Sequence, residues 1–126
     1  MTDKVTSFVI DRLTWHRGSD GASLLTDQGK RCCLGFFAKA CEVSDSEQLN
    51  TADPGELNAA SKKTLRDAGG DFLFMQDEYC ERQSKATDDL VFENDSSDVD
   101  AYYGSVREQR ITRIFAGNGV TVIFIN

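Results

Sequence analysis

The sequence predicts an α+β fold in which a small, mainly antiparallel sheet, built from both chain ends, packs against about four helices. Two runs rich in β-branched and aromatic residues lie near the two ends of the chain, at Val5–Arg12 and Val120–Ile125. Between them lies an almost wholly apolar segment with helical spacing, Cys32–Val43. The chain has 126 residues without an internal repeat or a linker, so we expect one globular domain over residues 1–126.

The helix over Cys32–Val43 is predicted to be buried and to form the centre of the core. When its residues are placed at steps of about 100°, Gly35, Lys39 and Glu42 share one narrow stripe. Every other position is apolar or cysteine. A helix with so narrow a polar stripe has to be covered on most sides.

Shorter patterns predict the elements around this helix. Ala22–Thr26 has the composition of a second strand, and the turn residues of Asp27–Lys30 would connect it to the buried helix. Asp53 followed by Pro54 is a typical helix start, so we expect a surface helix from Asp53 to about Asp67. The run at residues 72–75 is either a strand or a buried turn.

The last third of the chain is predicted to hold two helices and the final strand. Apolar spacing indicates a helix over Ser84–Phe92, and composition indicates a loop over Asn94–Asp100. Ser105 and Glu108 form a capping box that would start the last helix. Gly117–Gly119 would end this helix and turn the chain into Val120–Ile125. This strand has apolar side chains on both faces, so we expect it to be a central strand.

Charge is distributed unevenly along the chain. The net charge is −7, and residues 71–100 contain ten acidic side chains against only two basic ones. An acidic chain is a poor binder of nucleic acid, because neutralising phosphates requires a surplus of cations. The cluster is either a solvated face that aids solubility or a surface that meets a basic partner protein. The carboxylates proposed for such a surface are Asp77, Glu78, Glu81, Asp88, Asp89, Glu93, Asp95, Asp98 and Asp100.

The cysteines offer an enzymatic alternative. Cys32 and Cys33 lie at the start of the predicted buried helix, where a helix N-terminus lowers a thiol pKa. His16 is the only histidine and so the only imidazole base for a cysteine nucleophile. Cys32, at the edge of the apolar arc, is the better candidate, whereas the competing interpretation makes every cysteine a small core residue. No CxxC pair is present among the four cysteines (the other two are Cys41 and Cys80), so we predict no structural zinc.

Three further features bear on ligands. The segment Asn94–Asp100 has alternating oxygen side chains of the kind that bind calcium, but it lacks the glycine and the final glutamate of an EF-hand calcium loop. No glycine-rich phosphate loop, GxSxG elbow or HExxH motif occurs, and we predict no cofactor. Arg107 and Arg110 lie within or beside the apolar arc of the last helix, where we expect them to pair with carboxylates.

Several short motifs resemble a family of small proteins encoded by tailed phages and other mobile elements. The first is Trp15-His16-Arg17-Gly18, followed by Ser23-Leu24-Leu25 and then by the residues from Gly29 to Phe36, which include Cys32, Cys33 and Gly35. Asn94-Asp95 and the pattern of the last helix and strand resemble it too, whereas residues 44–90 diverge. The resemblance implies an origin rather than a reaction: an accessory protein of a mobile element, in the cytoplasm of a bacterial host.

Together these features favour an acidic protein-interaction module, and its candidate role is to inhibit a basic or nucleic-acid-binding host protein. The alternatives are a cysteine-dependent hydrolase or transferase using Cys32 or Cys33 with His16, and a metal- or small-ligand-binding domain. We expect a protein partner with a basic surface and no direct contact with nucleic acid. No apolar run is long enough for a membrane span, and the first residues lack the layout of a signal peptide. A homodimer could also form, because a short sheet with an apolar end strand can pair across a two-fold axis.

Overall fold

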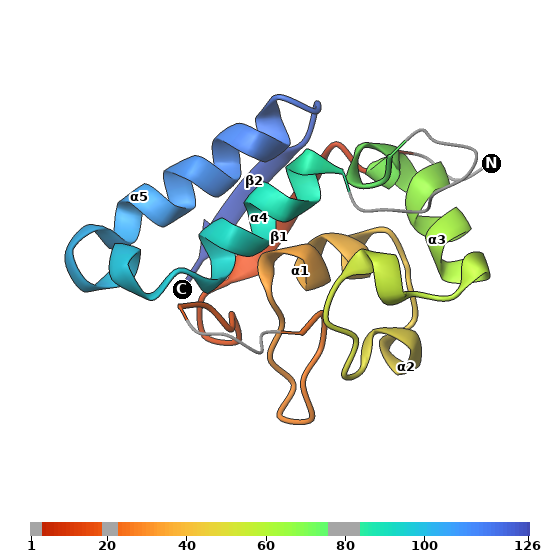
Figure 1. Cartoon of the computed structure of the whole chain (residues 1–126), viewed down its shortest axis with the longest axis horizontal. Coiled ribbons are helices and arrows are strands. Elements are labelled where there is room, and N and C mark those ends of the chain that lie inside the picture. Colours follow the sequence, from red (N-terminus) through yellow and green to blue (C-terminus); the bar gives the residue numbers. More distant parts are fainter. Residues whose placement is uncertain (1–3, 19–22, 76–83) are drawn as a thin grey trace.

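The computed structural model describes residues 4–18, 23–75 and 84–126, and for residues 97–105 it describes the backbone only. In this part of the chain, five α-helices accompany one sheet of two strands, β1 and β2. The strands come from the two ends of the chain, as predicted (Figure 1). The α-helices and strands are β1 (Ser7–Asp11), α1 (Cys33–Ala40), α2 (Asp45–Gln48), α3 (Ala59–Leu65), α4 (Lys85–Asp95), α5 (Ser97–Ala116) and β2 (Thr121–Ile125).

The sheet is parallel, so the predicted antiparallel arrangement is wrong. Ser7 pairs with Thr121 and Asp11 with Ile125, in one continuous register. Strands that are adjacent in the sequence can form a hairpin, but two strands at opposite chain ends are joined by a long crossover, which allows either direction. Here α5 runs back along the sheet and the turn at Gly117–Gly119 reverses the chain, which fixes the direction of β2.

The helices cover one face of the sheet and leave the other face open. Phe8 and Ile10 of β1 point into the core, whereas Ile123 and Ile125 of β2 are 46% and 42% exposed. Figure 1 shows α4 and α5 in front of the two strands, with α1 beside β1. The prediction that β2 is buried on both faces is therefore wrong, because no helix lies on the second face in the described structure.

The core is a cluster of aromatic rings around α1. The ring of Phe37 lies 5.3 Å from that of Phe8 and 5.4 Å from that of Phe115, measured between centroids. Phe72 closes the group at 5.8 Å from Phe37 and 6.0 Å from Phe115. Residues from Cys33 to Ala38 are all buried, so the prediction of a buried central helix is confirmed, although α1 ends at Ala40 rather than Val43.

Gly35 explains how α1 comes so close to the segment before it. A Cβ atom at Gly35 would lie 1.9 Å from the carbonyl oxygen of Leu24. Leu24 is fully buried there, but the predicted strand Ala22–Thr26 is absent among the described residues, where only Leu25 forms a single bridge, to Leu49. The predicted turn over residues 27–30 is confirmed: Thr26 N–H donates to the carbonyl of Lys30, and Gly29 has a φ of +79°.

The predicted helix from Asp53 to Asp67 is broken into shorter pieces. A single 3₁₀ turn over Pro54–Glu56 ends at Leu57, which is extended and buried. Asn58 is the actual N-cap, and its side chain accepts a 2.8 Å hydrogen bond from the N–H of Ser61. The free energy gained by burying Leu57 in the core exceeds the free energy that a continuous helix from Asp53 would contribute. The chain after α3 continues through a π turn (Arg66–Gly70) and a 3₁₀ turn (Asp71–Leu73). Phe72 and Leu73 therefore lie in a turn rather than a strand, and after them Phe74 is buried whereas Met75 is 45% exposed.

Helices α4 and α5 replace the loop predicted over Asn94–Asp100. The helix predicted over Ser84–Phe92 is confirmed and continues to Asp95, with the Ser84 side chain capping it. α5 starts at Ser97, so Ser105 lies inside it and is not an N-cap. The wholly buried Arg107 donates from Nε to the Glu93 carbonyl at 3.0 Å and from Nη2 to the Ser96 carbonyl. Arg107 thus satisfies carbonyls at the C-terminal end of α4. Arg110, the other arginine expected to pair with a carboxylate, lies 3.6 Å from Glu93.

Candidate functional site

The motif residues from three distant segments meet around the side chain of Asn94. Its Oδ1 accepts hydrogen bonds from the indole Nε1 of Trp15 at 2.8 Å and from the backbone N–H of Cys33 at 2.9 Å. Its Nδ2 donates to the carbonyl of His16 at 3.0 Å, and its own carbonyl accepts from Gly18 N–H at 2.8 Å. Asn94 is only 1% exposed. The side chain and the backbone carbonyl of this one buried residue therefore join both ends of the Trp15–Gly18 motif to α1 and α4.

Asn94 also caps α1 from a distance. The N-cap residue of α1 is Cys32, whose side chain makes no capping hydrogen bond. The first N–H groups of a helix have no partner within the helix. The Asn94 amide supplies that partner to Cys33 across 61 positions of sequence. We therefore interpret Asn94 as a structural joint that orders the start of the buried helix.

The remaining motif residues stabilise the same joint. The Arg17 guanidinium lies 4.4 Å from the centre of the Trp15 ring and donates to the carbonyl of Arg12 at 3.3 Å. Gly18 has a φ of +77°, a conformation that glycine adopts without strain. Trp15 itself belongs to the core, since its ring is buried and lies 5.5 Å from that of Phe124.

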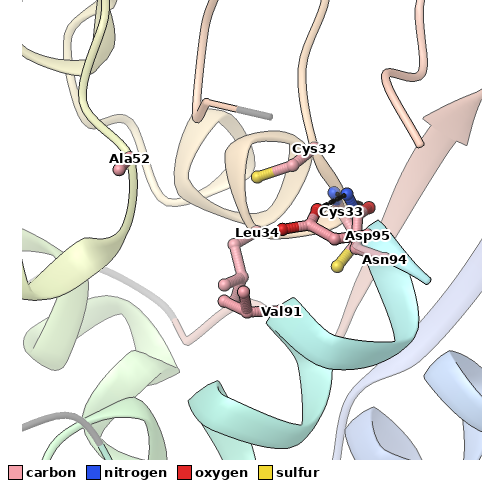
Figure 2. A pocket seen from close by; sticks show the side chains of 7 residues that line it. All are labelled: Cys32, Cys33, Leu34, Ala52, Val91, Asn94 and Asp95. Carbon is pink, nitrogen blue, oxygen red and sulfur yellow. Dashed lines mark hydrogen bonds between the residues drawn. The ribbon is translucent and has the colours of Figure 1, made fainter. Parts of the chain in front are cut away.

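The two adjacent thiols are buried at this joint and point in different directions (Figure 2). Cys33 donates its S–H to the carbonyl of Leu90 at 3.9 Å. The pKa of Cys32 is raised to about 11, chiefly by burial and to a smaller extent by the nearby Asp95 carboxylate, while N–H groups of the first helical turn partly oppose both effects. Burial also raises the pKa of Cys33 well above its ordinary value and that of Cys41 to about 12. At neutral pH these three cysteines are thiols, which are poor nucleophiles.

The hollow beside these cysteines is too small for a substrate. It lies between the start of α1 and the end of α4, as Figure 2 shows, and has a volume of about 10 Å³, roughly the room that one water molecule needs. Its lining residues are Cys32, Cys33, Leu34, Ala52, Val91, Asn94 and Asp95. His16, the proposed base, contributes backbone groups to the joint, with its N–H bonded to the carbonyl of Arg31 at 2.8 Å. The structure therefore offers no support for the cysteine enzyme.

The predicted acidic surface is described only in part. Asp77, Glu78 and Glu81, the predicted ligand or partner residues between α3 and α4, lie outside the described residues, as do the side chains of Asp98 and Asp100. Of the four others, which all lie on α4, three have partners inside the molecule: Asp89 pairs with Lys85 at 2.6 Å, Glu93 lies 3.6 Å from Arg110, and Asp95 accepts from Asn94 at 3.0 Å. Asp88 alone of these four is an exposed carboxylate without such a partner.

An exposed phenylalanine next to these carboxylates was not singled out from the sequence. Phe92 is 65% exposed on α4, away from the buried positions Thr87, Leu90 and Asn94. It lines a hollow of about 330 Å³ between α4 and α5, with Asp89, Glu93, Arg110, Arg113 and Ile114. A phenylalanine outside the apolar arc of an amphipathic helix is the sequence signal that identifies it.

Among the side chains that the structure describes, which leave out those of residues 97–105, no three His, Cys, Asp or Glu groups lie close enough to hold a metal ion. No helix in the described part of the chain combines the length and the apolar character needed to cross a bilayer.

No protein-family model, no curated protein and no solved structure matches this chain. The resemblance to mobile-element proteins therefore stays a prediction that depends on the short motifs alone. What the structure adds is a physical reason for those motifs, since their residues meet at the Asn94 joint.

Proposed function

We propose that this chain is a small accessory protein of the phage or mobile-element type that acts as a protein-interaction module in the bacterial cytoplasm. The observation that carries the proposal is the exposure of Phe92 on a helix bearing Asp88 and Asp89. Large aromatic side chains that protrude among charged residues are frequent anchors of protein interfaces. We call the surface formed by Asp88, Asp89, Phe92 and Arg113 the α4 face.

The charge of the chain indicates the kind of partner. The net charge of −7 and the ten acidic residues over positions 71–100 favour a protein with a basic surface. Carboxylates steer such a partner toward the α4 face, and the Phe92 ring supplies contact area once the partner has docked. A basic surface of this kind is typical of proteins that bind nucleic acid, so occupying it would inhibit them by competition with phosphate.

Affinity isolation from host cells, followed by binding measurements on the purified partner, tests this function. We expect Phe92→Ala to weaken binding at least tenfold, and Asp88→Asn with Asp89→Asn to weaken it mainly at low salt, where exposed charges are least screened. The matched controls are Leu13→Ala, another exposed apolar residue, and Glu42→Gln, an exposed acid on a different segment. Equal loss in the controls, or binding that does not weaken with added salt, would contradict the proposal.

A further inference from the structure

The tight turn between α5 and β2 contains the only asparagine of this chain that is followed by a glycine. Asn118 and Gly119 are both exposed there, and Figure 1 shows the turn at the upper edge of the molecule. Asparagine is a chemically labile residue of proteins, since the backbone nitrogen of the next residue can attack its side-chain amide. A following glycine has no Cβ atom that would hinder this attack.

The surroundings of Gly119 leave room for the attack. Gly119 has a φ of +82°, and a Cβ atom built there would meet no heavy atom of a more distant residue within 4 Å in the described structure. No other segment therefore crowds Gly119 on that side, which leaves space for the ring that the attack forms.

Two hydrogen bonds occupy the reacting groups in the folded turn. The Gly119 N–H donates to the carbonyl of Ala116 at 3.0 Å, and Nδ2 of Asn118 donates to the carbonyl of Ile114 at 2.9 Å. Both bonds lie at the exposed end of a helix, where local opening costs little free energy. A local opening of the turn, rather than unfolding of the whole chain, is therefore sufficient to free both groups.

We propose that Asn118 is a site of spontaneous deamidation in the folded protein. The Gly119 nitrogen loses its proton and bonds to Cγ of Asn118, while the bond from Cγ to Nδ2 breaks and Nδ2 leaves as ammonia. The product is a succinimide ring, which water opens at either of its two carbonyl carbons. Opening at Cγ gives an aspartate, whereas opening at the backbone carbonyl gives an isoaspartate, in which the main chain runs through the former side chain.

The isoaspartate lengthens the main chain by one atom immediately before β2. Val120 is 2% exposed, and its N–H donates to the carbonyl of Phe115 at 3.0 Å. Thr121 then pairs with Ser7 at the start of the sheet. An additional main-chain atom in so tight a turn displaces either the end of α5 or the first residues of β2. The new carboxylate also lies at the C-terminal end of α5, where the helix dipole disfavours negative charge.

Peptide mapping by mass spectrometry tests the site. The full chain is incubated at physiological temperature, folded and in urea, in neutral and in mildly alkaline buffer. We expect the peptide that contains Asn118 to gain the mass that separates a carboxylic acid from an amide, and to do so faster in alkaline buffer, which favours loss of the Gly119 proton. The two hydrogen bonds should slow the reaction in the folded chain roughly tenfold relative to the chain in urea.

The controls for this measurement lie in the same chain. Asn50 and Asn58 are also exposed, but they precede threonine and alanine, so their peptides should stay unmodified over the same time. Asn118→Gln keeps an amide but has to form a larger ring, and it should also stay unmodified. No mass gain at Asn118 in the folded chain, or an equal gain at Asn50 and Asn58, would overturn the proposal.

Hydrogen exchange on the separated products tests the effect on the sheet. We expect the isoaspartyl form to exchange the backbone amides of β1 and β2 faster than the parent chain, and to melt roughly 4 °C or more below it. Asn118→Asp is the matched control, because it carries the new charge without the longer main chain. Exchange in the isoaspartyl form that equals that of Asn118→Asp would contradict the displacement of β2. Neither measurement involves the α4 face, so this proposal can fail while the proposed function stands.

Discussion

The indole N–H of Trp15 donates to the side-chain oxygen of Asn94 at 2.8 Å across 79 positions of sequence. The same oxygen accepts from the backbone of Cys33, so one atom connects the strand-following motif, the buried helix and the end of α4. Because both donors are buried, neither can exchange its partner for water without cost. The residues that looked most like a candidate active site are thus part of the structural framework.

Replacing Asn94 with alanine should destabilise the fold strongly. The substitution leaves the N–H groups of Trp15 and Cys33 buried without an acceptor, and each such group costs about 1–3 kcal/mol. We expect the free energy of unfolding to fall by about 2–5 kcal/mol in urea, followed by Trp15 fluorescence. Asn118→Ala is the control, since its exposed amide bonds only the nearby Ile114 carbonyl, and a comparable loss there would contradict the role of the joint.

Replacing Gly35 with alanine should be among the most damaging small changes in the chain. The new Cβ atom would lie 1.9 Å from the Leu24 carbonyl oxygen, so backbone must move on one side or the other. We expect a loss of at least ~3 kcal/mol or failure to fold. Gly117→Ala is the matched control, because its Cβ would meet only ordinary contacts from 3.5 Å. Thermal unfolding, monitored by circular dichroism, distinguishes the two variants. Equal melting temperatures would refute the close approach of Gly35 to the Leu24 carbonyl.

Replacing Arg107 with methionine should separate α4 from α5. The guanidinium satisfies the carbonyls of Glu93 and Ser96, and a methionine of similar length would bury both carbonyls without these donors. We expect a loss of about 2–4 kcal/mol in the free energy of unfolding and faster amide exchange at the end of α4. The exposed Arg113→Met should change stability by no more than ~0.5 kcal/mol. If amide exchange at the end of α4 is unchanged in Arg107→Met, the hydrogen bonds from Arg107 to the two carbonyls are not what stabilises the end of this helix.

The described thiols should react slowly and make the fold sensitive to alkali. The pKa of Cys32 is raised to about 11 and that of Cys41 to about 12, from an ordinary value of 9.0. A group with a raised pKa in the folded state contributes its full stability below pH 9 and loses it as the pH rises through the folded pKa. Iodoacetamide labelling with mass spectrometry should find Cys32, Cys33 and Cys41 modified more slowly in the folded than in the unfolded chain. Rapid labelling of Cys32 at neutral pH would restore the enzyme hypothesis.

Local patterns in the sequence predicted the parts of the fold that depend on local chemistry. The apolar arc of the buried helix, the turn at Gly29 and the strand-forming ends all follow from side-chain spacing and backbone freedom. The strand direction did not follow, because β1 and β2 are joined by a crossover whose course depends on tertiary packing. The prediction of a loop over Asn94–Asp100 was also wrong because of tertiary structure. Hydrogen bonds from Asn94 and Arg107 to distant parts of the chain stabilise helix in this polar segment.

The candidate site could be predicted only in part. The sequence pointed to Cys32 and Cys33 as either reactive or buried, and spacing alone cannot choose between the two, whereas burial and the Asp95 carboxylate can. The acidic cluster was visible in the sequence, but its pairing with Lys85 and Arg110 depends on helix faces and on the packing of α4 against α5. The exposure of Phe92 could be predicted only once it was known which face of α4 is buried, because that face determines that the ring points outward.

Site-specific photo-crosslinking tests the central claim, that the α4 face is where this chain binds another protein. A photoreactive phenylalanine analogue is placed at position 92 in one variant and at the exposed position 13 in another, and both are irradiated in the host cell. The account predicts a discrete covalent adduct with a basic protein at position 92, absent at position 13 and lost when Asp88 and Asp89 are neutralised. No adduct at position 92, or the same adduct at both positions, would contradict it.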